Sequence, residues 1–209
     1  DKMFENLSNQ QKGSYMAFVA VMFITPDSLL IRLSNIETWG MLFYRGAIPF
    51  VVVLIGLLFF YKNNFLKALL GIGIPGIFYI VSFATCNITF LLSIQNTNVA
   101  NTLVMIALAP MLSAILGALF LKEIPDKKTW IAILFTFTAC VYIFHDSLKL
   151  GNIYGDLLGF ATAFGLACNA TLVRYAKDRD LVPSAVIGKL CVGIFAFFFV
   201  ENFELLGND

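Results

Sequence analysis

The sequence has few charged residues and a single histidine. Asp, Glu, Lys and Arg make up 13% of its 209 residues, 59% are hydrophobic, and the mean hydropathy is +0.85. A soluble domain usually carries roughly 25% charged residues, so these charges are too few to cover a surface that faces water. The net charge of +1 leaves no basic face for nucleic acid. The composition therefore indicates a membrane protein.

Residues that bind metals or cofactors are also scarce. Four cysteines, Cys86, Cys140, Cys168 and Cys191, stand singly in apolar runs, without the spacing of a metal site or a disulfide framework. His145 is the only histidine, and no GxxxxGK[ST] nucleotide-binding loop occurs. We therefore expect no metal site, no cofactor and no catalytic residues, and we expect the cysteines to be small buried thiols.

Seven apolar segments are long enough to cross a bilayer as helices, because about 20 residues span a hydrocarbon core roughly 30 Å thick. They are Ser14–Ile31, Trp39–Tyr61, Ala68–Leu92, Val99–Leu121, Trp130–Phe144, Ile153–Val173 and Val182–Val200. The third begins loosely among glycines, and the fifth is short. Membrane-spanning strands would need only about ten alternating residues. We predict an all-α, polytopic membrane protein.

The loops between these segments carry their cations asymmetrically. Ten cations lie on one side: Lys2, Lys12, Lys62, Lys67, Lys122, Lys127, Lys128, Arg174, Lys177 and Arg179. The opposite side has only Arg32 and Lys149. Cytoplasmic loops are enriched in Lys and Arg, so we expect a multi-pass protein of the cytoplasmic membrane with its N-terminus inside.

The first and sixth segments match at a shift of 142 residues. Aligned pairs are Gly13 with Gly155, Phe18 with Phe160, Asp27 with Asn169, Leu30 with Leu172 and Arg32 with Arg174; two extra residues then bring Arg45 onto Lys189. Because five segments separate the copies, the second copy enters from the opposite side, as in the inverted repeats of secondary transporters. Chance matching of apolar helices is the alternative.

The repeat sets the expected domain organisation. We predict a first five-helix repeat over 14–145 and the start of a second, inverted repeat over 153–209. On this reading seven helices of a ten-helix protein are present, and three further C-terminal helices would complete the second copy.

Several segments resemble the EamA family of the drug/metabolite transporter superfamily. They are Pro26–Arg32, Phe43–Arg45, the stretch from Thr97 through Pro110 to Glu123, and Gly155–Gly159. The resemblance implies ten helices in two inverted halves. It also implies export or exchange of small metabolites, amino acids or drugs.

From this resemblance we expect a secondary transporter that moves a small solute across the cytoplasmic membrane by alternating access. Its partners would be the lipid bilayer and the solute, and a homodimer is left open. A non-transporting membrane subunit is one alternative. A membrane-embedded enzyme is less favoured, since such enzymes cluster His, Asp, Ser or Cys near one interface. A retinal photoreceptor is opposed by the cytoplasmic N-terminus and by the absence of Asp and Glu from the third segment.

Three ionisable residues inside the segments are candidates for function, because burying a charge in a bilayer is costly. Asp27 and Arg45 reach a similar depth, and we predict that they form an ion pair. That pair would either line an outer gate and bind a zwitterionic solute, or only clamp the first two helices. Lys189 would either extend its ammonium to the cytoplasmic interface or face a central cavity and receive a carboxylate.

Neutral polar residues and prolines complete the candidate set. Asn87, Asn101 and Asn169 are too polar to face lipid, so we expect them inside the bundle, lining the solute path or forming interhelical hydrogen bonds. Pro26 and Pro110 should interrupt the first and fourth helices, because proline removes a backbone hydrogen bond. Such interruptions would suit helices that rock between inward- and outward-open states.

Overall fold

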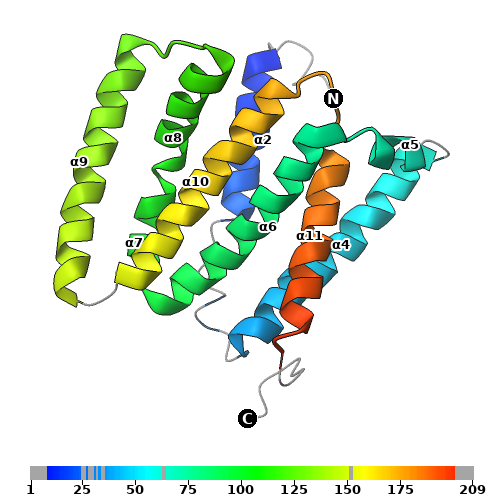
Figure 1. Ribbon diagram of the computed structural model, residues 1–209, viewed down its shortest axis with the longest axis horizontal. Coiled ribbons are helices and arrows are strands. Elements are labelled where there is room, and N and C mark those ends of the chain that lie inside the picture. Colours follow the sequence, from blue (N-terminus) through cyan, green and yellow to red (C-terminus); the bar gives the residue numbers. More distant parts are fainter. Residues whose placement is uncertain are drawn as a thin grey trace. The chain divides into compact units, whose positions relative to one another are not determined.

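The computed structural model describes residues 9–24, 27, 31, 33, 36–62, 65–150 and 153–200. The chain divides into an N-terminal unit, Asp1–Asn35, and a main unit, Ile36–Asp209. Every regular element within the described residues is a helix (Figure 1), in agreement with the predicted all-α class. The N-terminal unit contains α2, Asn9–Ile24, which begins five residues before the predicted start of the first segment. Pro26 lies outside the described residues.

The main unit contains the other helices in the order of the predicted segments. They are α4 (Thr38–Tyr61), α5 (Phe65–Leu70), α6 (Gly73–Asn96), α7 (Val99–Ile106), α8 (Ala109–Leu116), the π-helix η2 (Gly117–Leu121), α9 (Lys127–Leu150), α10 (Ile153–Tyr175) and α11 (Val182–Phe197). Within the part of the chain that the structure describes, four stretches are long and apolar enough to cross a membrane: α4, α6, the α7–η2 stretch and α10. The chain is thus a multi-pass membrane protein.

The third and fifth segments differ from their predicted bounds. The third was expected from Ala68, but α5 ends at Leu70 and α6 begins only at Gly73, whose φ of 60° breaks the helical path. This left-handed conformation is open to glycine at little steric cost. The fifth is longer than its apolar run, because α9 continues for 24 residues. The apolar run shows only which part of the helix can lie in lipid. The helix itself can be longer, because its backbone hydrogen bonds do not require apolar side chains.

Helix α10 packs against α6 on one side and against α7 and α8 on the other (Figure 1). It runs antiparallel to α6, since the Ser82 hydroxyl donates to the Gly165 carbonyl at 3.0 Å and Ser93 donates to the Gly155 carbonyl at 2.7 Å. Between these contacts, the hydroxyls of Thr89 and Thr162 are 2.7 Å apart. Short polar side chains thus join the two helices along their length, as is common between membrane helices.

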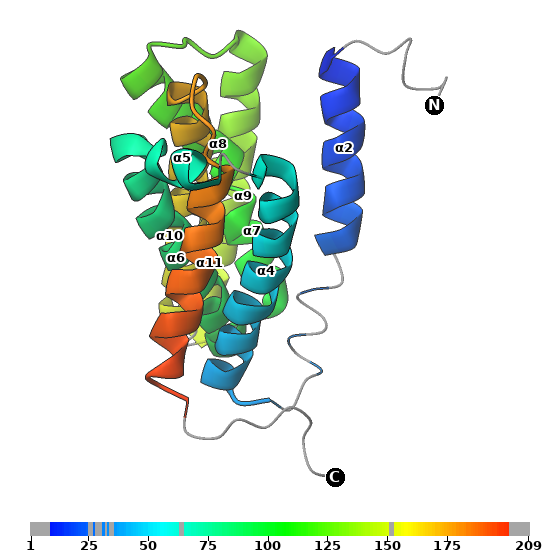
Figure 2. The same cartoon turned by 90° about the vertical axis from the view of Figure 1, so that its right-hand side faces the viewer.

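Helix α11 packs against α4 and α6, and Figure 2 shows α4 and α11 running side by side. Their backbones approach closely, since a Cβ built on Gly46 would lie 2.5 Å from the Gly193 amide nitrogen. At one end of this contact, the Trp39 ring stacks on Phe199 with centroids 4.8 Å apart. Trp39 begins α4 and Phe199 follows α11, so the two helices are antiparallel.

Candidate functional site

A polar contact near the middle of α6 joins this helix to α11. The Lys189 ammonium donates to the Asn87 side-chain oxygen at 2.6 Å, and the Asn87 amide nitrogen donates to the Phe83 carbonyl at 2.8 Å. The ammonium also lies 5.5 Å from the centroid of the Phe83 ring. Both polar side chains are half-buried. The sequence singled out both residues, and the structure brings them together between two helices.

The surroundings of Lys189 orient its charge. A lysine ammonium has three N–H donors, one of which is directed at Asn87. The Phe83 ring face attracts a cation through its quadrupole. Asn87 and Phe83 thus fix the position of the ammonium between α6 and α11, and neither of them carries a formal negative charge.

Close packing beneath the lysine depends on the residue before it. A Cβ built on Gly188 would lie 2.8 Å from Cδ1 of Phe83, which is too close for any larger residue without a shift of the ring. Gly188 is buried. The missing side chain therefore lets the Phe83 ring lie against α11 directly beside Lys189.

Two further polar side chains are buried on the neighbouring helices. Asn169 of α10 is 6% exposed and Ser184 of α11 is 0% exposed. Neither amide atom of Asn169 nor the Ser184 hydroxyl has a hydrogen-bond partner among the described residues. Leaving such a group unpaired costs about 1–3 kcal/mol. Asn169 therefore lies inside the bundle, as expected from the sequence, with unused hydrogen-bonding capacity.

The other predicted site residues are spread over the two units. The Arg45 guanidinium carbon lies 5.6 Å from the centroid of the Phe90 ring on α6. Asp27 belongs to the N-terminal unit, so its pairing with Arg45 stays a prediction. Asn101 is half-buried in the first turn of α7.

A buried carboxylate that the sequence analysis did not select lies in the first turn of α10. Asp156 is 0% exposed and accepts a hydrogen bond from the Thr97 hydroxyl at 2.7 Å. Nearby, the Ser93 and Thr102 hydroxyls are 2.8 Å apart. This cluster joins the start of α10 to the turn between α6 and α7. Asp156 stands only four residues into its apolar segment, so by sequence it resembled an interfacial residue.

The fourth predicted helix is broken just before Pro110. Helix α7 ends at Ile106, two residues in turn conformation follow, and α8 begins at Ala109 with Pro110 in its first turn. Pro110 has no N–H to donate to the Ile106 carbonyl, and its ring would clash with that oxygen in a regular helix. The chain is interrupted where the sequence placed the proline effect, although the break itself spans residues 107–108.

An arginine from α10 is bound to the far end of this broken helix. The Arg174 guanidinium donates to the Ser113 carbonyl and hydroxyl, each at 2.9 Å, and pairs with Glu123 at 2.8 Å. A Cβ on Gly117, at the start of the π-helix, would lie 3.0 Å from Arg174 Nη2. We call Arg174, Ser113, Glu123 and Gly117 the Arg174 clasp. It ties α10 to α8 and η2 next to a π-helix, a local geometry often found at functional sites.

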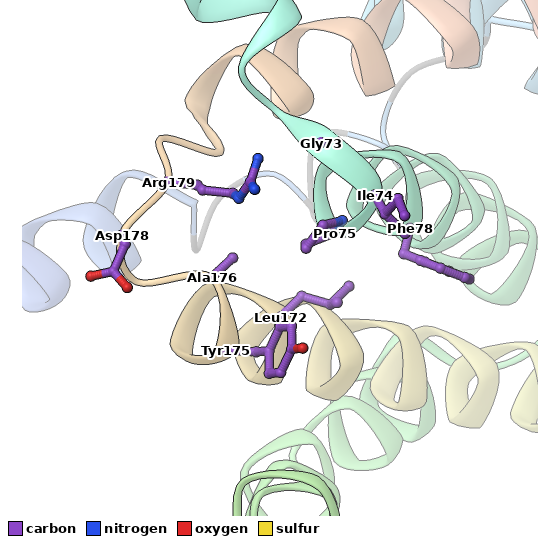
Figure 3. A pocket seen from close by; sticks show the side chains of 9 residues that line it. All are labelled: Gly73, Ile74, Pro75, Phe78, Leu172, Tyr175, Ala176, Asp178 and Arg179. Carbon is purple, nitrogen blue, oxygen red and sulfur yellow. The ribbon is translucent and has the colours of Figure 1, made fainter.

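Two cavities open where α6 begins and α10 ends. The first, of about 740 Å³, is lined by Gly73, Ile74, Pro75, Phe78, Leu172, Tyr175, Ala176, Asp178 and Arg179 (Figure 3). The second, also about 740 Å³, shares Phe78, Leu172 and Tyr175 with it and continues along α6 and α10 to η2. Sequence reasoning assigned no site here, because the lining combines the start of α6 with the end of α10, which lie far apart in the sequence.

No group of three or more His, Cys, Asp or Glu side chains that could hold a metal ion occurs among the described residues. Cys86 and Cys140 are buried, as expected, and Cys168 is half-buried. Cys191 is exposed on α11, so the expectation of a buried thiol is wrong there. Its helix is packed on other faces, toward α4 and α6.

The chain matches the sequence model of the EamA-like transporter family over residues 3–145, more than half of its length. No curated protein and no solved structure matches the chain. The matched stretch includes α6 with Asn87 and Phe83, the break before Pro110, and most of α9.

Proposed function

The chain belongs to the EamA-like transporter family of the drug/metabolite transporter superfamily, and from this premise we propose that it is a secondary transporter for a small solute that carries a carboxylate. It would export or exchange that solute across the cytoplasmic membrane by alternating access. The observation that carries the proposal is the Lys189–Asn87 contact between α11 and α6. A half-buried, positioned ammonium in a transporter is a site at which an anionic group of the solute can bind.

An inverted relation between α4 and α11 supports this reading. Arg45 is the eighth residue of α4, and Lys189 is the eighth residue of α11. The two helices are antiparallel and touch at Gly46 and Gly193. Equal positions on antiparallel partners are what a pseudo-twofold axis in the membrane plane produces. In this proposal the axis passes near the glycine contact.

Both cations face aromatic rings of the same helix. Arg45 lies over Phe90 and Lys189 over Phe83. Phe83 and Phe90 are seven residues apart, so they share one face of α6. We therefore assign this face of α6 to the solute path, with Asn87 between the two rings. The unpaired amide of Asn169 is a further candidate for binding polar groups of the solute.

Alternating access requires helices to move against each other. In this proposal the movement occurs at the break before Pro110 and at the Arg174 clasp. The turn before Pro110 lacks one backbone hydrogen bond, so α7 and α8 can change their mutual angle at low cost. The Arg174 clasp binds the other end of α8 through exposed groups, with side chains 41% and 56% exposed for Arg174 and Glu123. An exposed pair of this kind is worth only about 0–1 kcal/mol, so it can open and close during a transport cycle.

Counterflow in proteoliposomes tests the proposal. Vesicles that contain the full chain are loaded with a panel of unlabelled amino acids and carboxylic acids, and uptake of each labelled solute is measured. For the solute that exchanges, we expect Lys189→Met to lower uptake at least about tenfold, because a hydrogen bond to a charged group contributes roughly 1.5–3 kcal/mol. Asn87→Leu should lower it less.

Two variants control for general effects of charge and of folding. Lys67→Met removes a cation from the exposed last turn of α5 and should leave uptake unchanged. Lys189→Arg keeps the charge and should retain part of the uptake. If Lys189→Met transports the carboxylate as fast as the parent protein, the assigned site is wrong. If no solute exchanges with the parent protein, a non-transporting membrane subunit becomes the better interpretation.

A further inference from the structure

The cavity in Figure 3 and its neighbour adjoin each other and differ in their chemistry. They share Phe78, Leu172 and Tyr175. The part at the helix ends contains Arg179 and Asp178, and the part along α6 and α10 is lined mainly by apolar side chains. We call the first the charged mouth and the second the apolar groove. A charged part next to an apolar part matches the headgroup and the hydrocarbon chain of an amphiphilic molecule.

The apolar groove has little to offer a polar ligand. Its lining includes Leu116, Phe120 and Phe164. Two of its hydroxyls are already committed, since Ser82 donates to the Gly165 carbonyl at 3.0 Å and Thr171 donates to the Ala167 carbonyl at 2.8 Å. A hydrocarbon chain can fill such a groove without leaving these donors unpaired.

The cation of the charged mouth is held in place by the backbone. Arg179 Nη1 donates to the Gly71 carbonyl at 3.1 Å. The guanidinium occupies the space where a side chain of Gly73 would be, and the φ of 60° at Gly73 also favours glycine. Figure 3 shows the Arg179 side chain turned toward Gly73 and Pro75. A guanidinium has five N–H donors in a planar fork that suits a phosphate group.

The carboxylate of Asp178 stands at the same mouth, whereas the next acid in the loop is engaged elsewhere. Asp180 accepts hydrogen bonds from the Tyr61 hydroxyl and from the Val182 amide. Arg179 and Asp178 are adjacent in sequence and both line the mouth, and Figure 3 shows their side chains turned in different directions. This charge pattern matches a zwitterionic headgroup better than an anionic one, because an anionic headgroup would meet Asp178 without a compensating charge.

We propose that this groove is a binding site for phosphatidylethanolamine. The phosphate would bind Arg179, the primary ammonium would bind Asp178, and one acyl chain would lie along α6 and α10 toward Phe164. The site opens at the end of α6 where the cation-rich loops lie, which is the side expected to be cytoplasmic. Basic pockets between helices on that side bind anionic headgroups such as those of cardiolipin and phosphoinositides. This mouth differs from them, because Asp178 also lines it. The inference does not rest on transport, and its test needs no flux measurement.

Native mass spectrometry of the full chain measures headgroup preference. The delipidated protein is mixed with equal amounts of phosphatidylethanolamine, phosphatidylcholine and phosphatidylglycerol that carry identical acyl chains. We expect phosphatidylethanolamine to be retained about tenfold more than phosphatidylcholine, whose quaternary ammonium has no N–H to donate to Asp178. Equal retention of all three lipids by the parent protein would overturn the proposal.

Three variants assign that preference to residues. Arg179→Gln should lose the retained phospholipid, and Asp178→Asn should bind phosphatidylethanolamine and phosphatidylcholine equally. Lys177→Gln removes the neighbouring cation, which does not line the cavity, and should behave like the parent protein. Thermal unfolding of each variant shows that loss of lipid does not reflect loss of folding. Unchanged retention in folded Arg179→Gln would refute the headgroup assignment.

A fluorescence measurement locates the acyl chain. In Phe164→Trp the new indole lies in the apolar groove, and in Phe60→Trp it lies on a side chain of α4 that is 89% exposed. With phosphatidylethanolamine brominated on its acyl chains, quenching at position 164 should saturate at a low fraction of that lipid. Quenching at position 60 should follow the bulk lipid composition. Parallel curves at both positions would mean that the groove takes bulk lipid without selection.

Discussion

Replacing Gly46 by alanine tests whether the α4–α11 contact determines the packing of the main unit. The added Cβ would lie 2.5 Å from the Gly193 nitrogen and 2.7 Å from its Cα, whereas ordinary contact begins at 3.4 Å. The two backbones must therefore separate by about 1 Å, since backbone atoms cannot rotate away as a side chain would. Overpacking of this kind costs about 1–3 kcal/mol.

The same helix supplies a matched control. A Cβ on Gly56 would meet nothing within 4 Å, so Gly56→Ala should stabilise α4 by up to about 1 kcal/mol through helix propensity. The two substitutions are chemically identical and both lie within α4. The gain in helix propensity is common to both and cancels in their difference in free energy of unfolding. That difference thus measures the close approach alone, and we expect about 1–3 kcal/mol in favour of Gly56→Ala.

Trp39 provides a signal from the same interface. Its ring stacks on Phe199 at 4.8 Å and meets Phe195 edge-on at 6.2 Å, so its emission should report separation of α4 and α11. Unfolding is followed by tryptophan fluorescence during a denaturant titration in detergent micelles, for the parent protein and both variants. Equal unfolding free energies for Gly46→Ala and Gly56→Ala would refute the close approach, and with it the position that we assign to the pseudo-twofold axis.

Two further predictions concern the ends of α10. Gly117→Ala should displace the Arg174 guanidinium from the clasp. Both Gly117→Ala and Arg174→Gln should change the free energy of unfolding by less than about 1 kcal/mol and should alter the counterflow rate. An unchanged rate in both variants would show that the clasp has no part in the transport cycle. At the other end, Asp156→Ala leaves the buried Thr97 hydroxyl without its acceptor and should destabilise the protein by about 1–3 kcal/mol, whereas Asp156→Asn retains an acceptor oxygen and should cost less. Chemical denaturation measures both, and equal losses would show that the hydrogen bond to Thr97 contributes nothing.

Two of the long apolar helices could be predicted closely from the sequence, because bilayer thickness imposes a minimum length on an apolar run. The predicted segment Trp39–Tyr61 differs from α4 by one residue at its start, and Val99–Leu121 coincides with the α7–η2 stretch. The internal breaks of that stretch could not be predicted with the same accuracy. Pro110 signalled an interruption, but nothing in the local sequence indicated the π-helix. It begins at Gly117, where the Arg174 guanidinium from α10 lies close to the backbone.

The sequence indicated individual residues of the candidate site, but it did not indicate which of them contact one another. Lys189 and Asn87 were each conspicuous as polar groups within apolar runs, yet their contact depends on how α6 and α11 are rotated about their axes. Hydropathy leaves that rotation undefined. Two glycines face the partner helix at this contact, since a Cβ on Gly188 would lie 2.8 Å from the Phe83 ring and a Cβ on Gly76 would lie 2.8 Å from the Ser184 hydroxyl. Neither glycine gave a signal by composition alone. Asp156 was not among the candidates, since it stands near the start of its apolar segment. In the structure it is fully buried and accepts a hydrogen bond from Thr97, in the turn after α6.

The two cations of α4 and α11 mark two levels along the proposed solute path. Because Phe83 and Phe90 are seven residues apart on α6, the rings beneath Lys189 and Arg45 differ in height by about 10 Å. The hydrocarbon core is roughly 30 Å thick, so a carboxylate that passed from one cation to the other would cover about a third of it. The remaining distance has to be opened by helix movement rather than bridged by fixed charges. Breakable contacts near the helix ends, such as the Arg174 clasp, are therefore the places where control of access should be sought.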